Sequence, residues 1–143
     1  MNGNLAQFGE DLRLHLFRLQ VSLNNISELF SGGRITNEAE FASRLGELRT
    51  MADASSARAT ELRRMLQDRL ERDAALAPES VSRWIGRRQT AQLHARADLI
   101  EQLATIAVEL ATLSTLESER ITMMAILARR EAVSVQVQRD DRS

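Results

Sequence analysis

The sequence predicts an all-α protein: an antiparallel three-helix bundle of coiled-coil-like character with one long C-terminal helix. Three observations favour this class. Aromatic residues, which sheets favour, make up only 3% of the chain. The composition is rich in Ala, Leu, Arg and Glu, which all favour helices. Apolar side chains recur at alternating spacings of three and four residues, which is the period of one helix face.

The first helix is expected over residues 4–30 of a single domain that spans 1–143. Its main apolar seam consists of Leu5, Phe8, Leu12, Leu16, Leu19, Leu23, Ile26 and Phe30. A second stripe runs beside it and consists of Leu14, Phe17 and Val21. We therefore expect this helix to be buried against more than one neighbour. The Gly32-Gly33 pair ends it.

The second helix is expected over residues 37–76. Asn37 and Glu40 have the spacing of a capping box at its start. Its seam is close to a strict heptad and consists of Phe41, Leu45, Leu48, Ala52, Ser55, Ala59, Leu62 and Leu66. The helix ends before Pro78, because the residue before a proline disfavours helical backbone.

The third helix is the longest and is expected over residues 80–137, with Ser80 as its N-cap and a disordered tail over 138–143. Its seam consists of Leu99, Leu103, Ile106, Leu110 and Leu113, and then of Met124 and Leu127 after Glu117 and Arg120 have taken two seam positions. Ser114 and Glu117 have capping-box spacing. This leaves open an alternative with four helices and a break near Ser114.

The length of the third helix predicts self-association. At 1.5 Å per residue the three helices span roughly 40, 60 and 85 Å, so the third overhangs the others. The overhang carries a candidate partner or oligomer surface that consists of Ile121, Met123, Met124, Ile126 and Leu127. Because this cluster is too apolar to be left in water, we expect a second subunit in a dimer to cover it. The alternative is that these residues form the protein's own core.

Residues suited to catalysis or cofactor binding are sparse. Cysteine is absent, and the only histidines are His15 and His94, whereas a metal site needs three or four ligands at suitable spacing. The acidic residues have arginines nearby, as on a solvated, charge-laced helix face. The sequence also lacks a phosphate-binding loop. We expect a non-enzymatic protein without a cofactor.

One segment, residues 80–97, is basic and contains no acid. Its candidate anchor and basic patch consist of Trp84, Arg83, Arg87 and Arg88. Three interpretations are open: solvated arginines around a half-buried Trp84 with Arg88 over its ring, a protein-binding hot spot, and a nucleic-acid site. The net charge of −1 and the single tryptophan argue against nucleic acid.

Trp84, Ile85 and Gly86 spell W-x-G, and this tripeptide resembles the one at the hairpin turn of the small secreted bacterial W-x-G proteins. In general make-up the chain is similar to phasins, which coat polyester granules, and to the helical export chaperones of flagellar and type III secretion systems. All 19 basic residues are arginines, for which two explanations are open: a GC-rich genome that favours arginine codons, and pressure against lysine modification.

These patterns together favour a non-enzymatic helical assembly or adaptor protein that acts through self-association and protein contacts. The alternatives are an amphipathic binder of lipid or polymer granules and an export chaperone. We expect a cytoplasmic protein, because Glu10 and Asp11 precede the first basic residue, which is unlike a secretory signal. We expect no transmembrane segment, because no run of about 18 apolar residues occurs.

Overall fold

A computed structural model describes residues 5–30 and 38–142, and the chain is helical over almost all of these ranges. The elements are α1 (Leu5–Glu28), α2 (Glu38–Arg72), the short 3-10 helix η1 (Ala74–Leu76), α3 (Pro78–Gly86) and α4 (Thr90–Arg142). The predicted all-α class is confirmed, and the described ranges contain no strand. The predicted Gly32-Gly33 turn and the Asn37 cap lie outside the described residues.

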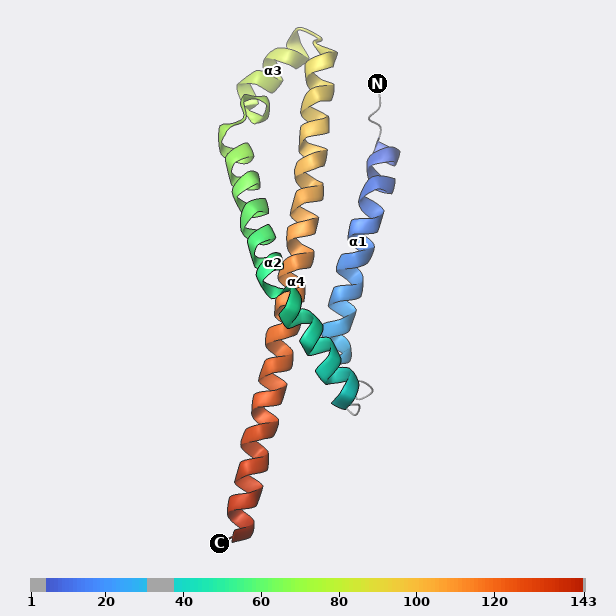
Figure 1. Cartoon of the computed structure of the whole chain (residues 1–143). Helices are drawn as coiled ribbons and strands as arrows, with labels where there is room; N and C mark the ends of the chain where they lie inside the picture. Colours follow the sequence, from blue (N-terminus) through green and yellow to red (C-terminus); the bar gives the residue numbers. More distant parts are fainter. Residues whose placement is uncertain (1–4, 31–37, 143) are drawn as a thin grey trace.

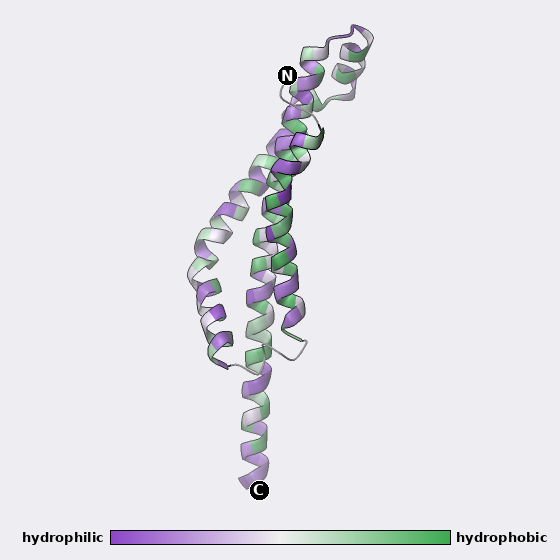
Figure 2. Cartoon of the chain, turned by 90° about the vertical axis from the view of Figure 1, so that its right-hand side faces the viewer, coloured by the Kyte–Doolittle hydropathy of each residue, from purple (hydrophilic) through white to green (hydrophobic). Residues whose placement is uncertain are grey.

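The longest helix, α4, is the element on which the rest of the chain packs (Figure 1). α1 lies along one side of it in the same direction, and α2 lies along another side in the opposite direction. Its 53 residues span about 80 Å at 1.5 Å per residue. α4 therefore continues past the ends of α1 and α2, and its C-terminal turns protrude alone in both views (Figures 1 and 2).

The main core lies where the first half of α2 crosses α4 near the end of α1 (Figure 1). Its buried side chains are Leu29, Phe41, Leu45, Leu48 and Met123. Leu116, Ile126 and Leu127 pack against this cluster and are partly buried. Leu62 on α2 and Leu103 on α4 are buried farther along the pair. The chain thus has a short core at the crossing and thinner packing toward α3.

The heptad seam of α2 is the best-predicted part of the fold. Each of its eight seam positions, from Phe41 to Leu66, is buried or partly buried, and its neighbours on the outer side are exposed. The small residues Ala52, Ser55 and Ala59 in the middle are only partly buried. They allow close approach of α4 but remove little apolar area from water, which explains the thin packing there.

The packing face of α1 differs from the predicted one. The side chains that are buried or partly buried are Phe8, Leu12, His15, Leu19, Ser22, Asn25, Ile26 and Leu29. Leu16 and Leu23 of the predicted seam are 45% and 53% exposed, and the second stripe of Leu14, Phe17 and Val21 is also exposed. The prediction that α1 is buried against more than one neighbour is wrong within this chain, because the described helix packs along α4 on one side.

The seam of α4 also changes register. Leu103, Leu110 and Leu113 face the other helices as predicted, but the buried positions then run through Leu116, Glu119 and Met123. Met124 is 41% exposed, so the predicted continuation through Met124 is wrong by one residue. At about 100° per residue, Met123 lies about 160° around the helix from Leu103. The covered side of α4 therefore changes along its length, because α2 crosses it near Met123 (Figure 1).

The chain breaks at Arg87–Gln89, and this break corrects the predicted helix over 80–137. The amide of Gln89 donates to the carbonyl of Trp84 at 2.8 Å, and that of Arg88 donates to Ile85 at 3.1 Å. Together with a φ of 54° at Arg88, this is a Schellman motif, which normally places glycine in the left-handed position. The helix therefore ends at Gly86 and the chain reverses into α4.

Three smaller corrections follow from the helix bounds. Ser80 is not an N-cap: α3 starts two residues earlier at Pro78, the first helical position where proline is well tolerated, and Ser80 is buried inside it. α4 runs unbroken through Ser114, so the predicted break there is wrong; the described residues do form four α-helices, but the additional break lies at Arg87–Gln89. Residues 138–142, predicted as a disordered tail, are the last turn of α4.

Candidate interaction surfaces

The five apolar residues of the candidate partner surface are divided between the core and the outside. Met123 is 1% exposed and belongs to the core, and Ile126 and Leu127 pack against that core. Ile121 and Met124 are 54% and 41% exposed on the opposite side of α4. Three residues of the cluster therefore join the protein's own core, and two remain on the surface.

The exposed side of α4 continues as an apolar face into the protruding segment. We call it the outer face of α4, and it consists of Ile121, Met124, Ala128, Ala132 and Val135, all exposed. These positions are spaced 3, 4, 4 and 3 residues apart and so lie along one side of the helix. The core side of the same turns becomes polar at Arg130 and Ser134. Figure 2 shows apolar segments continuing along α4 beyond the other helices.

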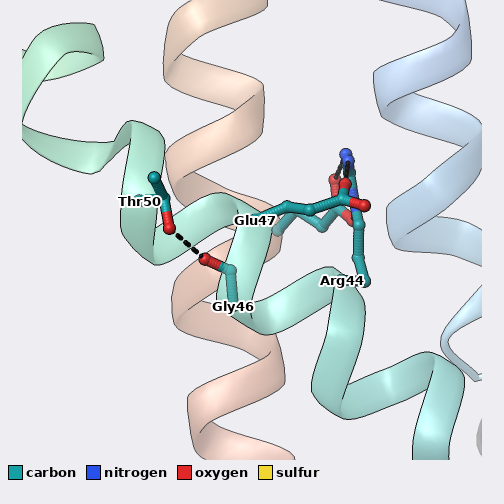
Figure 3. A network of polar contacts seen from close by, with 5 residues as sticks. Arg44, Gly46, Glu47 and Thr50 are labelled. Atoms are coloured by element: carbon teal, nitrogen blue, oxygen red, sulfur yellow. Dashed lines mark hydrogen bonds and ion pairs between the residues drawn. The ribbon is translucent and has the colours of Figure 1, made fainter.

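A buried ion pair joins α2 to α4 beside the core. Glu119 is 0% exposed and accepts two hydrogen bonds from Arg44, at 2.7 Å from Nε and 2.8 Å from Nη2. Arg44 also donates to Glu47 at 3.1 Å from Nη1, and Figure 3 shows both side chains meeting on the same side of α2. The hydrogen bond to Glu119 raises the pKa of Arg44 above its ordinary value. The guanidinium of Arg44 is therefore charged at neutral pH.

Sequence reasoning missed this pair because it placed Arg120, not Glu119, in the α4 seam. Arg120 instead donates to Glu117 one turn earlier on the same helix and lies 3.6 Å from the sulfur of Met124. Only the register change described above brings Glu119 inward. The helical period from Leu103 gives no signal for this change, because on a straight helix residue 120 lies nearer than residue 119 to the side of Leu103.

A second ion pair between the same two helices lies nearer to α3. Arg58 of α2 donates to both carboxylate oxygens of Glu109 of α4, at 3.1 and 3.4 Å, and its other nitrogen lies 3.4 Å from Glu61. The hydrogen bond to Glu109 raises the pKa of Arg58. Both side chains of this pair are in contact with water. The pair therefore contributes more to the alignment of α2 on α4 than to the stability of the fold.

Two grooves flank the first half of α2. One, of about 520 Å³, is bounded by Leu29, Phe41, Arg44, Glu119 and Met123 among others. The other, of about 630 Å³, lies between α2 and the start of the protruding segment and is bounded by Phe41, Arg49, Leu127, Arg130 and Val135 among others. Arg130 lies over the ring of Phe41 at 5.4 Å. Both grooves are lined by apolar and charged residues together.

The basic patch lies at the α3 end of the molecule. Arg83, Arg87 and Arg88 are exposed, and Trp84 is half-buried, as expected for a tryptophan that packs on its own fold. The predicted stacking of Arg88 on Trp84 is not among the cation–π contacts of the described residues, because the left-handed backbone at Arg88 interrupts the helical i,i+4 relation. Nearby on α4, Nε of Arg96 is buried without a hydrogen-bond partner.

The described residues offer no group of three or more His, Cys, Asp or Glu side chains that could hold a metal ion. His15 is half-buried on the packing face of α1, and His94 is exposed. By length and composition alone, α4 contains an 18-residue window apolar enough to cross a membrane. Only 6% of that window is buried inside the protein, and a single helix of this kind is weak evidence for a membrane span.

Comparison with protein-family models, with curated proteins and with solved structures finds no match to this chain. The inference of function therefore rests on the surfaces described above.

Proposed function

We propose that this chain is a non-enzymatic helical assembly or adaptor protein, which acts by self-association and by contacts with other proteins. The observation that supports the proposal is the large area of surface that the chain leaves exposed to solvent. The chain exposes 10157 Å². A compact monomer of 16.1 kDa exposes about 7,400 Å² by the usual scaling of surface with mass. The excess is larger than the roughly 800 Å² that each partner buries in a standard interface.

The excess surface is apolar in two places that the chain itself leaves uncovered. On α1, Leu14 and Phe17 are 56% and 61% exposed. On α4, the outer face exposes Ile121, Met124 and Val135. Single exposed apolar residues are ordinary, but contiguous ones along a helix mark sites of contact with a partner. Helical faces of this kind pair with other helices through residues spaced three and four apart.

Light scattering tests the proposal directly. We expect the wild-type chain to have a mass well above 16.1 kDa and Met124→Asp to reduce that mass, because a buried carboxylate without a partner opposes association. Gln102→Asp is the matched control, since it adds the same charge at an exposed position of the same helix, and it should leave the mass unchanged. A wild-type chain that remains a monomer at all concentrations would refute self-association.

A second candidate function is binding to lipid or polymer granule surfaces, and the exposed stripe of α1 favours it. Leu14, Phe17 and Val21 lie on the side of α1 away from its packing face, so this helix could lie on an apolar surface without leaving α4. Co-sedimentation with liposomes and with polyester granules tests this function. Phe17→Asp should abolish sedimentation, and a wild-type chain that stays in the supernatant in both assays would eliminate it.

A further inference from the structure

The residues of the outer face of α4 are arranged symmetrically about Ala128, and the helical period keeps them on one side of the helix. Met124 and Ala132 lie four residues on either side of Ala128, and Ile121 and Val135 lie seven residues on either side. Offsets of four, seven and eleven residues return to the same side of an α-helix, because they are close to one, two and three turns of 3.6 residues. The face can therefore pair with a reversed copy of itself.

In such a reversed pair the side chains that meet are complementary in size. Met124 meets Ala132 of the second copy, so a long side chain faces a short one. Ile121 meets Val135, so two branched side chains that are 54% and 64% exposed in the single chain cover each other. Ala128 meets Ala128 at the centre, where two small side chains allow the helices to approach closely. Large facing small is the arrangement that fills a helix interface without voids.

The charges at the ends of the face are complementary too. Glu117 and Arg139 lie eleven residues on either side of Ala128, so each carboxylate meets a guanidinium of the second copy at both ends. Glu117 already pairs with Arg120, but its side chain remains 46% exposed. A carboxylate has about four lone-pair sites and can accept from two arginines. In the antiparallel pair Glu117 lies opposite Arg139 at both ends, and this charge complementarity favours the antiparallel arrangement over a parallel one.

The surroundings of the face leave room for a second helix. Residues 131–142 are all exposed, although the first turn of this segment also borders the groove beside α2. At the Glu117 end the face opens into a groove of about 250 Å³ between α2 and α4, bounded mainly by small or hydroxylated residues such as Ser55, Ala59 and Ser114, with Arg63 at its rim. In the reversed pair the last turn of the second copy reaches this groove.

We propose that two copies of this chain pair antiparallel along the outer face of α4, with a two-fold axis at Ala128. The inference rests on the proposed function and specifies how the self-association is built. The protruding end of each α4 lies along residues 117–125 of the other copy, and the ion pairs between Glu117 and Arg139 close both ends. Helices packed 8–10 Å apart bring the two Ala128 Cα atoms to about 5 Å.

Cysteine cross-linking tests this geometry, because the chain contains no cysteine of its own. A disulfide needs Cα atoms roughly 4.4–6.8 Å apart. Under mild oxidation we expect Ala128→Cys to form a covalent dimer. Ile121→Cys and Val135→Cys should each stay uncrosslinked alone, since the two copies of either position are about 21 Å apart, and an equimolar mixture of the two should crosslink. Gln102→Cys is the exposed control on the same helix and should not crosslink.

Each result decides between specific alternatives. Crosslinking of Ile121→Cys with itself would overturn the antiparallel register in favour of a parallel pair. A dimer by light scattering without crosslinking at Ala128 would overturn the geometry while leaving the proposed function intact, and another surface or a helix of a different protein would then be the occupant of this face. A wild-type monomer would refute both together.

A charge swap provides an independent readout. Glu117→Arg should weaken the dimer, and adding Arg139→Glu should restore it. Glu117 and Arg139 of one chain are about 33 Å apart along α4, so rescue can only occur between copies. Failure of the second change to restore the dimer would show that these two residues do not meet.

Discussion

Removing Arg44 should destabilise the protein far more than removing Glu119, although the two residues form one ion pair. With Arg44→Met, the carboxylate of Glu119 stays buried without its two hydrogen bonds. With Glu119→Met, Arg44 keeps Glu47 as a partner and its side chain is already 26% exposed, so its charge remains in contact with water. The two single variants therefore leave very different charges behind.

The magnitudes follow from this asymmetry. Breaking a buried pair so that one charge is left unpaired costs about 3–5 kcal/mol. Because water reaches Arg44, we expect the lower end, about 3 kcal/mol, for Arg44→Met. For Glu119→Met we expect the free energy of unfolding to fall by about 1 kcal/mol, which is the net contribution of a hydrogen bond when its removal leaves no buried charge unpaired. The double variant should be close to wild type, since two methionines fill similar volume and leave no charge inside.

Urea denaturation followed by circular dichroism measures these differences, at one fixed protein concentration because association also contributes to stability. The double-mutant cycle then isolates the interaction between the two side chains. Equal losses from the two single variants would refute the reasoning, because they would show that Glu119 is not isolated from water when Arg44 is removed.

Three further predictions concern single positions. Gly46→Ala should stabilise the protein by about 0.5–1 kcal/mol, because Gly46 lies inside α2 and an added Cβ meets nothing within 4 Å. Thermal or urea unfolding measures this gain, and a loss of stability would contradict the open space at this position. Arg88→Gly should stabilise the protein by about 0.5–1 kcal/mol in the same assay, because glycine adopts the φ of 54° without strain. An unchanged stability would argue against the left-handed turn at this residue. The hydrogen bond from Arg120 lowers the pKa of Glu117 below its usual range. The small stability that it contributes is therefore present above the ordinary glutamate pKa of about 4.3 and is lost as the pH falls through the lowered value. An NMR titration in which Arg120→Gln leaves the Glu117 pKa unchanged would exclude this cause.

The helical class and the face of α2 could be predicted because they depend on local properties of the chain. Composition, the absence of proline from helix interiors and the spacing from Phe41 to Leu66 all act through the geometry of a single helix. A pattern of this kind states which residues share a side. It does not state how many sides will be covered, and for this reason the wide apolar surface of α1 was taken for a buried one.

The turn at Arg87–Gln89 escaped prediction for a different reason. A helix end normally shows glycine in the left-handed position, but here glycine stands at Gly86, and the left-handed residue is Arg88. The strain at Arg88 is accepted because the packing of α3 and η1 against α4 requires the chain to reverse there. Ser114 carried a local signal for a helix break, namely its capping-box spacing to Glu117. α4 nevertheless runs through Ser114, because the neighbouring turns of α4 lie along α2.

By itself the sequence determined the helical class and the seam of α2, since these follow from side-chain period and backbone preference. Only the tertiary structure decided which apolar residues became core and which remained outside. That division depends on the crossing of α2 over α4, which turns Met123 and Glu119 inward and leaves Ile121 and Met124 on the surface. Which side of α4 is covered at each level depends on the helix that crosses it there, and this separates a core position from an exposed one.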